Sequence, residues 1–250
     1  MINFGAGKLI AIPTNDSLGA VISNPTPVVL AALQDVSVDL SVELKTLYGN
    51  KRYPLAIGQG KGKTEIKAKY ADINAGVLGS LFYGKTASAG IKAAVLDFGA
   101  AIPATPFQVT IVPPSSGTYV ADLGVSKAGV QMTRVASSPT TGQYSVNTAT
   151  GVYTFAAADT LLDVLISYEY TASSTTGKIS NLTNEIMGVT PSFTALLQTA
   201  YDGKTLVMKL NRCVSGKLNL PLKSDDFSMF DFEAEAFEDA AGSLGYICLF

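Results

Sequence analysis

Two stretches with alternating side chains decide the fold of this chain: DVSVDLSVELK at residues 35–45 and KTEIKAKY at residues 63–70. In both, apolar and polar residues alternate without interruption. A period of two buries one face of a β-strand and leaves the other face in water. The pair therefore predicts an antiparallel hairpin. Its connection, from Tyr48 to Gly62, is expected to be a long loop held by something outside the fold, because hairpin connections usually have two to five residues.

Further strand signals extend this prediction along the chain. A short strand is expected from Lys8 to Ile12, and the pair Asp202-Gly203 predicts a tight turn before an alternating strand that begins at Leu206. The preceding segment, 193–200, could be a helix or a strand, and we choose a strand. Alternation also marks residues 230–236, and a last strand is expected over 245–250.

One short helix is expected after Asp72, which is a good N-cap residue, with a natural stop at Gly84. Its apolar face would consist of Ile73, Val77, Leu78, Leu81 and Phe82.

The middle of the chain changes character, because short strands and turn signals follow one another closely over residues 104–172. We expect an all-β insertion or outer lobe there, flanked by the two parts of a main domain over 1–103 and 173–250. The expected fold class is mainly β, with two packed antiparallel sheets in a sandwich or partial barrel and one short helix. Strands within the lobe are expected at residues 107–112, 130–136, 142–147, 151–155 and 164–170.

Composition narrows the possible functions. Charged residues make up 15% of the 250 residues, below the roughly 25% of ordinary soluble domains. A weakly charged surface is tolerated where it meets other protein, and a monomer covered by Ser, Thr and Gly is the alternative. The net charge of −2 gives no reason to expect tight nucleic-acid binding. Histidine is absent, which excludes Ser-His and Cys-His nucleophile pairs and histidine-ligated metals.

Other sequence signals concern location and thiols. No run of 18 apolar residues occurs and no secretory signal is recognisable, so neither a membrane segment nor secretion is expected. The two cysteines, Cys213 and Cys248, are expected to be reduced thiols.

Two motifs could indicate a nucleotide-binding or carboxylate site, but for each of them a purely structural role is favoured. The stretch GQGKGKT at residues 58–64 nearly matches a phosphate-binding loop, but Ile57 replaces the first glycine and a strand follows instead of a helix. The row Asp231, Glu233 and Glu235 could hold calcium or form an acid–base pair. A catalytic acid–base pair needs two carboxyl groups whose environments give them different pKa values, and three similar neighbours on one exposed strand do not provide such environments. A solvated strand face is therefore favoured over a catalytic site. We expect no catalytic residue, metal or cofactor.

Several stretches, taken in order, resemble the tail-tube (major tail) proteins of long-tailed bacteriophages. These stretches are 33–39, 67–73, 142–146 with 151–155, and 218–237. The resemblance implies hexameric rings that stack into a tube, with a hairpin loop reaching the adjacent ring and DNA passing through the bore. It also implies contacts with a length-setting protein, a terminator and distal tail proteins, and a place in the virion after synthesis in the host cytoplasm. The 104–172 lobe departs from the minimal family pattern and would be an outward decoration.

The resemblance also implies two sets of working residues. The inter-ring loop would consist of Tyr48, Gly49, Asn50, Lys51, Arg52, Tyr53, Gly58, Gln59, Gly60, Lys61 and Gly62. The lumen-facing set would comprise the acidic Asp39, Glu43, Glu65, Asp231, Glu233 and Glu235 with the basic Lys45, Lys63, Lys67, Lys69 and Lys209. Six acidic and five basic groups make a nearly neutral wall, which should not hold phosphates tightly.

Two other functions stay open at this point. A carbohydrate- or receptor-binding β-sandwich could use Tyr119, Tyr144 and Tyr153 of the lobe as a sugar-stacking surface. A hydrolase could use Asp231 with Glu233 or Glu235 as its carboxylate pair.

Overall fold

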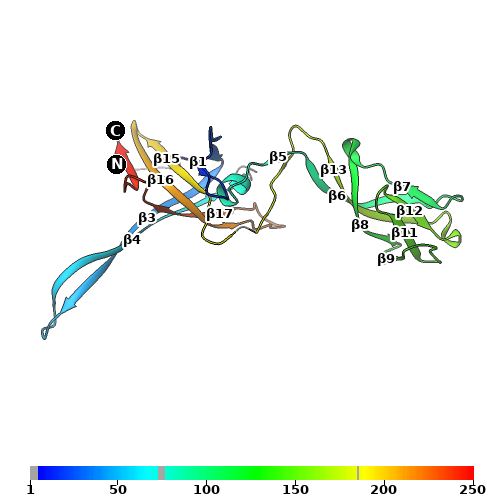
Figure 1. Ribbon diagram of the computed structural model, residues 1–250, viewed down its shortest axis with the longest axis horizontal. Coiled ribbons are helices and arrows are strands. Elements are labelled where there is room, and N and C mark those ends of the chain that lie inside the picture. The colour runs from blue at the N-terminus through cyan, green and yellow to red at the C-terminus, as the bar shows by residue number, and fades with distance from the viewer. Residues whose placement is uncertain (1–4, 73–76, 185) are drawn as a thin grey trace. The chain divides into compact units, whose positions relative to one another are not determined.

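The computed structural model describes residues 5–72, 77–184 and 186–250, and the chain divides into two compact units (Figure 1). Unit 1 comprises residues 1–87 and 180–250, and unit 2 comprises residues 88–179. The predicted mainly β fold, with one short helix and an inserted all-β lobe, is confirmed.

Unit 1 is built on one antiparallel eight-stranded sheet. The strand order is β2-β1-β15-β16-β17-β4-β3, and β18 pairs with the first half of β16. The strands are β1 (Lys8–Asn15), β2 (Val28–Leu30), β3 (Leu33–Tyr48), β4 (Pro54–Tyr70), β15 (Ser192–Tyr201), β16 (Lys204–Asn219), β17 (Phe230–Phe237) and β18 (Gly245–Leu249). Asp202 and Gly203 both have positive φ at the β15–β16 turn, so the predicted tight turn and the strand before it are confirmed.

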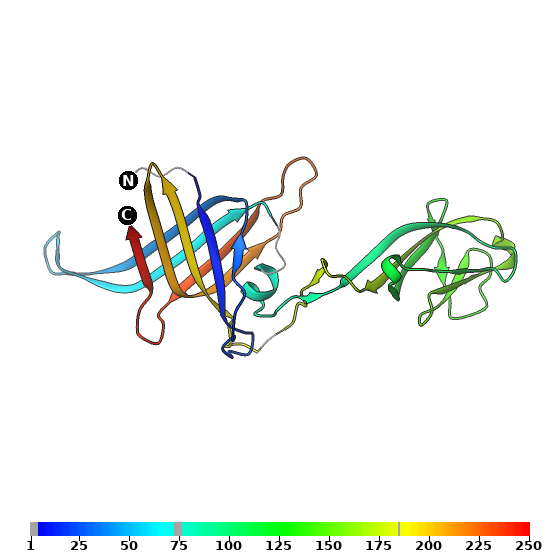
Figure 2. The ribbon, with the colours of Figure 1, turned by 90° about the horizontal axis from the view of Figure 1, so that it is seen from above.

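The sheet of unit 1 folds over its own core. Figure 2 shows β1, β15 and β16 crossing β3, β4 and β17, so that two halves of one sheet face each other. Alternation turns Ile66, Ala68 and Tyr70 of β4 inward together with Phe230 and Phe232 of β17, and all five are buried. Burial of such side chains is the main stabilising contribution, at about 1.5–3 kcal/mol for each large apolar residue.

The predicted helix is present as η1 (Val77–Phe82), a single π-helical segment. Its Val77 and Leu81 are buried in the core of unit 1. Gly84 follows with a φ of +63°, which fits the predicted stop. Ile73 and the side chain of Leu78 lie outside the described residues.

The long predicted loop between the first two strands is wrong in extent. The connection is only residues 49–53, and residues 54–62 continue β4 paired with β3, for example Lys45 opposite Gly58 and Leu47 opposite Ala56. The register shifts between Val42 and Leu44 and again between Leu47 and Tyr48. Gly58, Gly60 and Gly62 interrupt the side-chain alternation, so the sequence reads as a loop where the ladder continues. The result is a hairpin arm of unit 1, defined here as residues 40–64, which projects beyond the core (Figure 1).

Unit 2 consists mainly of two four-stranded sheets, β6-β13-β8-β9 and β10-β11-β12-β7. Its inner faces meet in a separate core that includes Ile102, Val125, Tyr153, Ile166 and Tyr168. All pairs are antiparallel except β10 with β11. The elements are β5 (Ser88–Ala89), β6 (Ile91–Ala101), β7 (Gln108–Thr110), η2 (Pro114–Ser116), β8 (Thr118–Lys127), β9 (Val130–Gln131), β10 (Thr133–Arg134), β11 (Gln143–Asn147), β12 (Val152–Phe155), η3 (Ala157–Asp159), β13 (Asp163–Ala172) and β14 (Lys178–Ile179).

The lobe is larger than the predicted 104–172, because it also contains β5, β6 and β14. Strand β6 reads IKAAVLDFGAA, in which small residues and a bulge near Asp97 obscure the alternation. The two-stranded sheet of β5 and β14 brings the two ends of the insertion together, with Ala89 opposite Lys178.

Candidate functional site: the hairpin arm and the charged sheet face

The tip of the hairpin arm separates the residues that the sequence groups into one loop. Tyr48 ends β3, residues 49–53 form the turn, and residues 58–62 lie within β4. Tyr48 and Tyr53 are exposed on either side of the turn. The predicted contact loop is therefore a paired strand extension with a short tip, and its length comes from the β3–β4 ladder.

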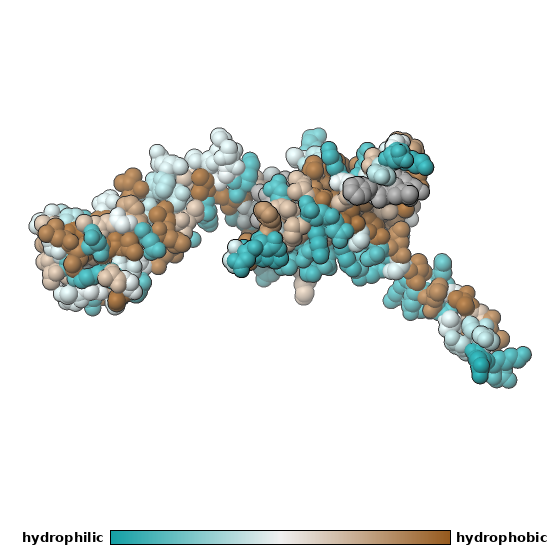
Figure 3. Space-filling model, turned by 180° about the vertical axis from the view of Figure 1, so that it is seen from behind, coloured by the Kyte–Doolittle hydropathy of each residue, from teal (hydrophilic) through white to brown (hydrophobic). Residues whose placement is uncertain are grey.

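One face of the arm continues the core face of the sheet into solvent. Val36 and Val38 of β3 pack against the core, and Leu40 and Val42 follow at the same period of two. Leu40 lies opposite the buried Thr64, but Leu40 and Val42 are themselves exposed. Leu44 and Ile57 extend the exposed apolar surface farther out, and Figure 3 shows brown atoms along the arm.

The opposite face of the arm carries three of the predicted charged residues, Glu43, Lys45 and Lys63. A Cβ at Gly60 would lie 3.1 Å from Glu43 Oε2 and 3.1 Å from Lys45 Cε, so these side chains lie over the glycine. Gly60 therefore leaves room for these two side chains on the polar side of the arm. Glu43 and Lys45 lie farther out along the arm than Lys63, which pairs opposite Ser41.

Eight of the predicted charged residues share one face of β3, β4 and β17. The registers place Asp39, Glu65 and Glu235 in one row, and Lys67 opposite Glu233 in the next. Opposing residues of neighbouring strands lie on the same side of a sheet. These eight predicted residues are Asp39, Lys63, Glu65, Lys67, Lys69, Asp231, Glu233 and Glu235.

Ion pairs neutralise part of this charged face internally. Lys67 Nζ lies 3.3 Å from Glu65 and 3.8 Å from Asp39, and Lys63 contacts Glu65 and lies 3.9 Å from Glu235. The hydrogen bond from Lys63 lowers the pKa of Glu65, and Lys67 adds to the effect. The hydrogen bond to Glu65 likewise raises the pKa of Lys63. Each such exposed pair contributes little to stability.

Sequence reasoning missed two members of the face, Asp35 and Lys217, and misplaced Lys209. Asp35 of β3 lies opposite Lys69. Lys217 of β16 lies opposite Glu233 and contacts its carboxylate at 2.8 Å, which raises the pKa of Lys217. A register irregularity between Ser215 and Lys217 shifts the alternation of side chains along β16, so the period of two did not predict that this lysine lies on the charged face. Lys209 instead lies opposite Leu196 and Tyr246, away from the charged rows.

The strand order leaves the outer edges of three strands unpaired among the described residues. These are β2 and β3, the two ends of the path through the sheet, and β18, which pairs only with β16. β3 is 16 residues long, and a long unpaired edge is a template for pairing with another chain. The edge and the exposed apolar face lie on the same strand.

The structure also places the residues of the alternative sites that the sequence suggested. Tyr119, Tyr144 and Tyr153 are buried, so the predicted sugar-stacking surface is wrong: the three rings pack together in the core of unit 2. The GQGKGKT stretch lies in β4 and does not begin a helix. Asp231, Glu233 and Glu235 lie on the charged face, with Glu233 and Glu235 paired to lysines.

The structure gives two further results within its described ranges. No group of metal-ligating side chains is found among residues 5–72, 77–184 and 186–250. In the same part of the chain, no helix has the length and apolar character that a membrane crossing requires.

No protein-family model matches this chain, and a comparison with curated proteins finds none that is significantly similar to it.

Proposed function

We propose that this chain is a structural subunit that assembles with copies of itself into hexameric rings, which stack as the tail tube of a bacteriophage and conduct DNA. The observation that carries the proposal is the hairpin arm, whose core-side face remains apolar beyond the core. In an isolated subunit Leu40, Val42 and Leu44 are in contact with water. A surface of this kind marks an interaction site in a soluble protein.

A sister copy offers a surface of matching chemistry. A groove of about 440 Å³ between β3 and the β15–β16 pair is lined by the apolar Val36, Val38, Leu197, Leu206 and Met208, together with the polar Gln34, Asp35 and Thr199. Val38 precedes Leu40 by one strand period, so groove and arm form a continuous apolar surface. Copies that pair along β3 would also satisfy its unpaired backbone groups.

The charged face supports the role of a conduit. If this face lines the bore, its Lys63, Lys67 and Lys217 are already paired with carboxylates and release few counterions when DNA passes. Weak attraction suits DNA that must slide. In this proposal the other partners are the length-setting, terminator and distal tail proteins, and the subunit resides in the virion.

The test removes the arm without disturbing the core. Residues 43–61 are replaced by Asn-Gly, a type I′ turn that joins the opposed residues Val42 and Gly62. The matched control replaces Asp202-Gly203 by Asn-Gly at the β15–β16 turn, where both φ angles are already positive. Electron microscopy should show rings or tubes for the wild type and the control, and only folded, unassembled subunits for the truncated arm. Normal tubes from the truncated variant would refute the proposal.

A further inference from the structure

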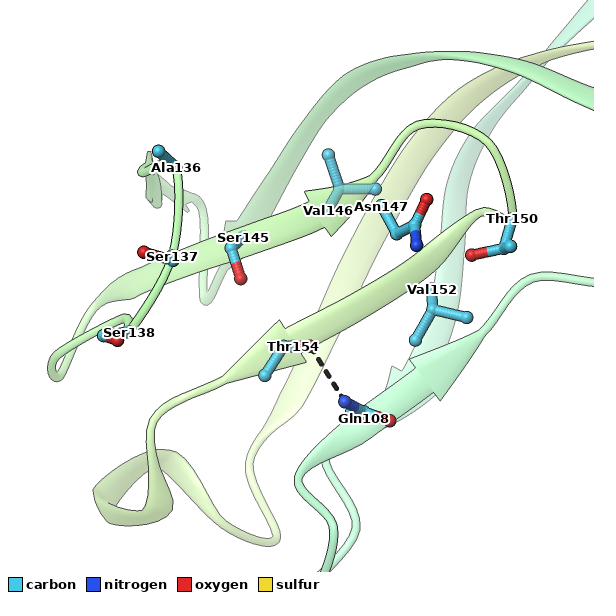
Figure 4. Close-up of a pocket in the computed structure, with 10 residues that line it drawn as sticks. All are labelled: Gln108, Ala136, Ser137, Ser138, Ser145, Val146, Asn147, Thr150, Val152 and Thr154. Carbon is cyan, nitrogen blue, oxygen red and sulfur yellow. Dashed lines mark hydrogen bonds between the residues drawn. The ribbon is translucent and has the colours of Figure 1, made fainter.

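Unit 2 contains a cavity that plays no part in assembly as proposed above. It has a volume of about 550 Å³ and lies over the outer face of β7, β11 and β12, beside residues 136–138 (Figure 4). Ligand sites commonly fall in this size range. Because Tyr144 and Tyr153 point into the core, their neighbours Ser145 and Thr154 point outward into the cavity.

The chemistry of the lining is uniform. Among the described residues that line it, all are serine, threonine, asparagine, glutamine, valine or alanine, with no charged or aromatic side chain. Hydroxyl and amide groups both donate and accept hydrogen bonds. A charged ligand would find no opposite charge, and a purely apolar ligand would leave the hydroxyl groups without partners.

The polar groups are held in place by the fold. Thr154 Oγ1 accepts a hydrogen bond from Gln108 Nε2 at 3.2 Å, which leaves its own proton to donate. Asn147 Oδ1 accepts from the Ala149 backbone N–H at 3.0 Å, so its amide nitrogen is available as a donor. Behind the sheet, Tyr144 and Tyr153 both donate to the carboxylate of Asp122, at 2.8 and 2.9 Å. Fixed polar groups lower the ordering cost of binding.

We propose that this cavity binds a neutral carbohydrate. A sugar presents many hydroxyl groups that can donate and accept, carries no charge, and has C–H faces that can contact Val152 on the floor of the cavity. The absence of an aromatic platform from the described lining predicts weak binding, in the millimolar range of dissociation constants. This inference is independent of the proposed tube assembly, because it concerns unit 2 alone.

Saturation-transfer difference NMR on the full chain tests the proposal, since the method works for both monomers and large assemblies. The probes are maltotriose and N,N′,N″-triacetylchitotriose as short neutral sugars, dextran as a neutral polymer, and a sulfated chondroitin disaccharide as the charged comparison. We expect transfer to at least one neutral probe, roughly fivefold weaker binding in Thr154→Val from loss of one hydrogen bond, and unchanged binding in Thr118→Val, on the exposed surface of β8. Response to dextran but not to the short sugars would identify a polymer as the ligand source.

The outcomes that overturn the proposal are equally specific. They are no transfer to any neutral probe, equal binding in Thr154→Val and wild type, or stronger transfer to the sulfated disaccharide. Should Thr154→Val fail to fold by circular dichroism, Ser145→Val on the neighbouring strand replaces it, with the same expected loss.

Discussion

Removing the apolar side chains from the core-side face of the arm should abolish assembly without unfolding the subunit. The change is Leu40→Ser with Val42→Ser and Leu44→Ser, at side chains that are 60%, 48% and 64% exposed. Full burial of a leucine or valine stabilises by about 2 kcal/mol, and only the exposed part remains to be buried in an interface. The three residues together are then worth roughly 3 kcal/mol per arm, or about a hundredfold in the concentration needed for assembly.

The assay is sedimentation velocity with negative-stain microscopy over a range of concentrations. The matched control is Leu96→Ser with Leu123→Ser and Val130→Ser, at strand positions of unit 2 that are 69%, 48% and 69% exposed. Both triple variants should keep the free energy of unfolding within about 1 kcal/mol of wild type, as surface substitutions do. The reasoning is refuted if the arm variant assembles at the wild-type concentration, or if the control variant loses assembly to the same degree.

Three further predictions concern stability and reactivity. The hydrogen bond with Lys63 lowers the pKa of Glu65 in the folded protein. The stability that ionised Glu65 contributes is therefore present above the ordinary glutamate pKa and is lost as the pH falls toward the lower pKa of the folded state. NMR titration of Lys63→Met should show a rise in the pKa of Glu65. Tyr153→Phe removes a hydrogen bond to a buried carboxylate and should lower the free energy of unfolding by about 1–3 kcal/mol, measured by urea denaturation. Burial raises the pKa of Cys213 to about 12, so in the dilute native protein a thiol reagent should modify Cys248 alone and reach both thiols after denaturation.

Each of these predictions has a clear contrary result. An unchanged Glu65 pKa in Lys63→Met would show that the pair does not form in solution. A loss from Tyr153→Phe no larger than that from Tyr53→Phe, at an exposed tyrosine of the arm, would contradict the buried network. Modification of Cys213 at the rate of Cys248 in the native protein would mean that the core of unit 1 opens readily.

Side-chain alternation predicted those strands of unit 1 that have one buried and one wet face, whereas β2, with only three residues, was not predicted. Strand β17 is the clearest case: Phe230 and Phe232 are buried, while Glu235 is exposed, as the period of two requires. The tight turn at Asp202-Gly203 was also predictable, since few residue pairs accept two successive positive φ angles.

Where glycines or bulges interrupt alternation, the sequence misled. Gly58, Gly60 and Gly62 remove the apolar signal from the outer half of β4, so a paired ladder read as a loop. In unit 2, β8 carries irregular register against β13 at two places, and Gly124 has a φ of +119°, so this strand was not predicted. A bulge moves the residues that follow it to the opposite face, which no local pattern records.

The charged face was predictable for the same reason as the strands. Opposite charges at matching positions of β4 and β17 follow from alternation once those strands are paired, as for Lys67 with Glu233. Lys217 could not be found, because the irregularity in β16 changes its parity. The burial of Tyr119, Tyr144 and Tyr153 could not be predicted either. Aromatic residues alternate along a strand in the same way whether they face a ligand or a core. These three are buried because the second sheet of unit 2 packs against them, and the local sequence does not show that packing.

The measurement that tests the central claim most directly is negative-stain electron microscopy of the purified wild-type protein from dilute to concentrated solution. If sister copies complete the exposed arm and the unpaired edge of β3, six-fold rings should appear and grow into tubes as the concentration rises. A uniform population of single subunits at every concentration would contradict the account.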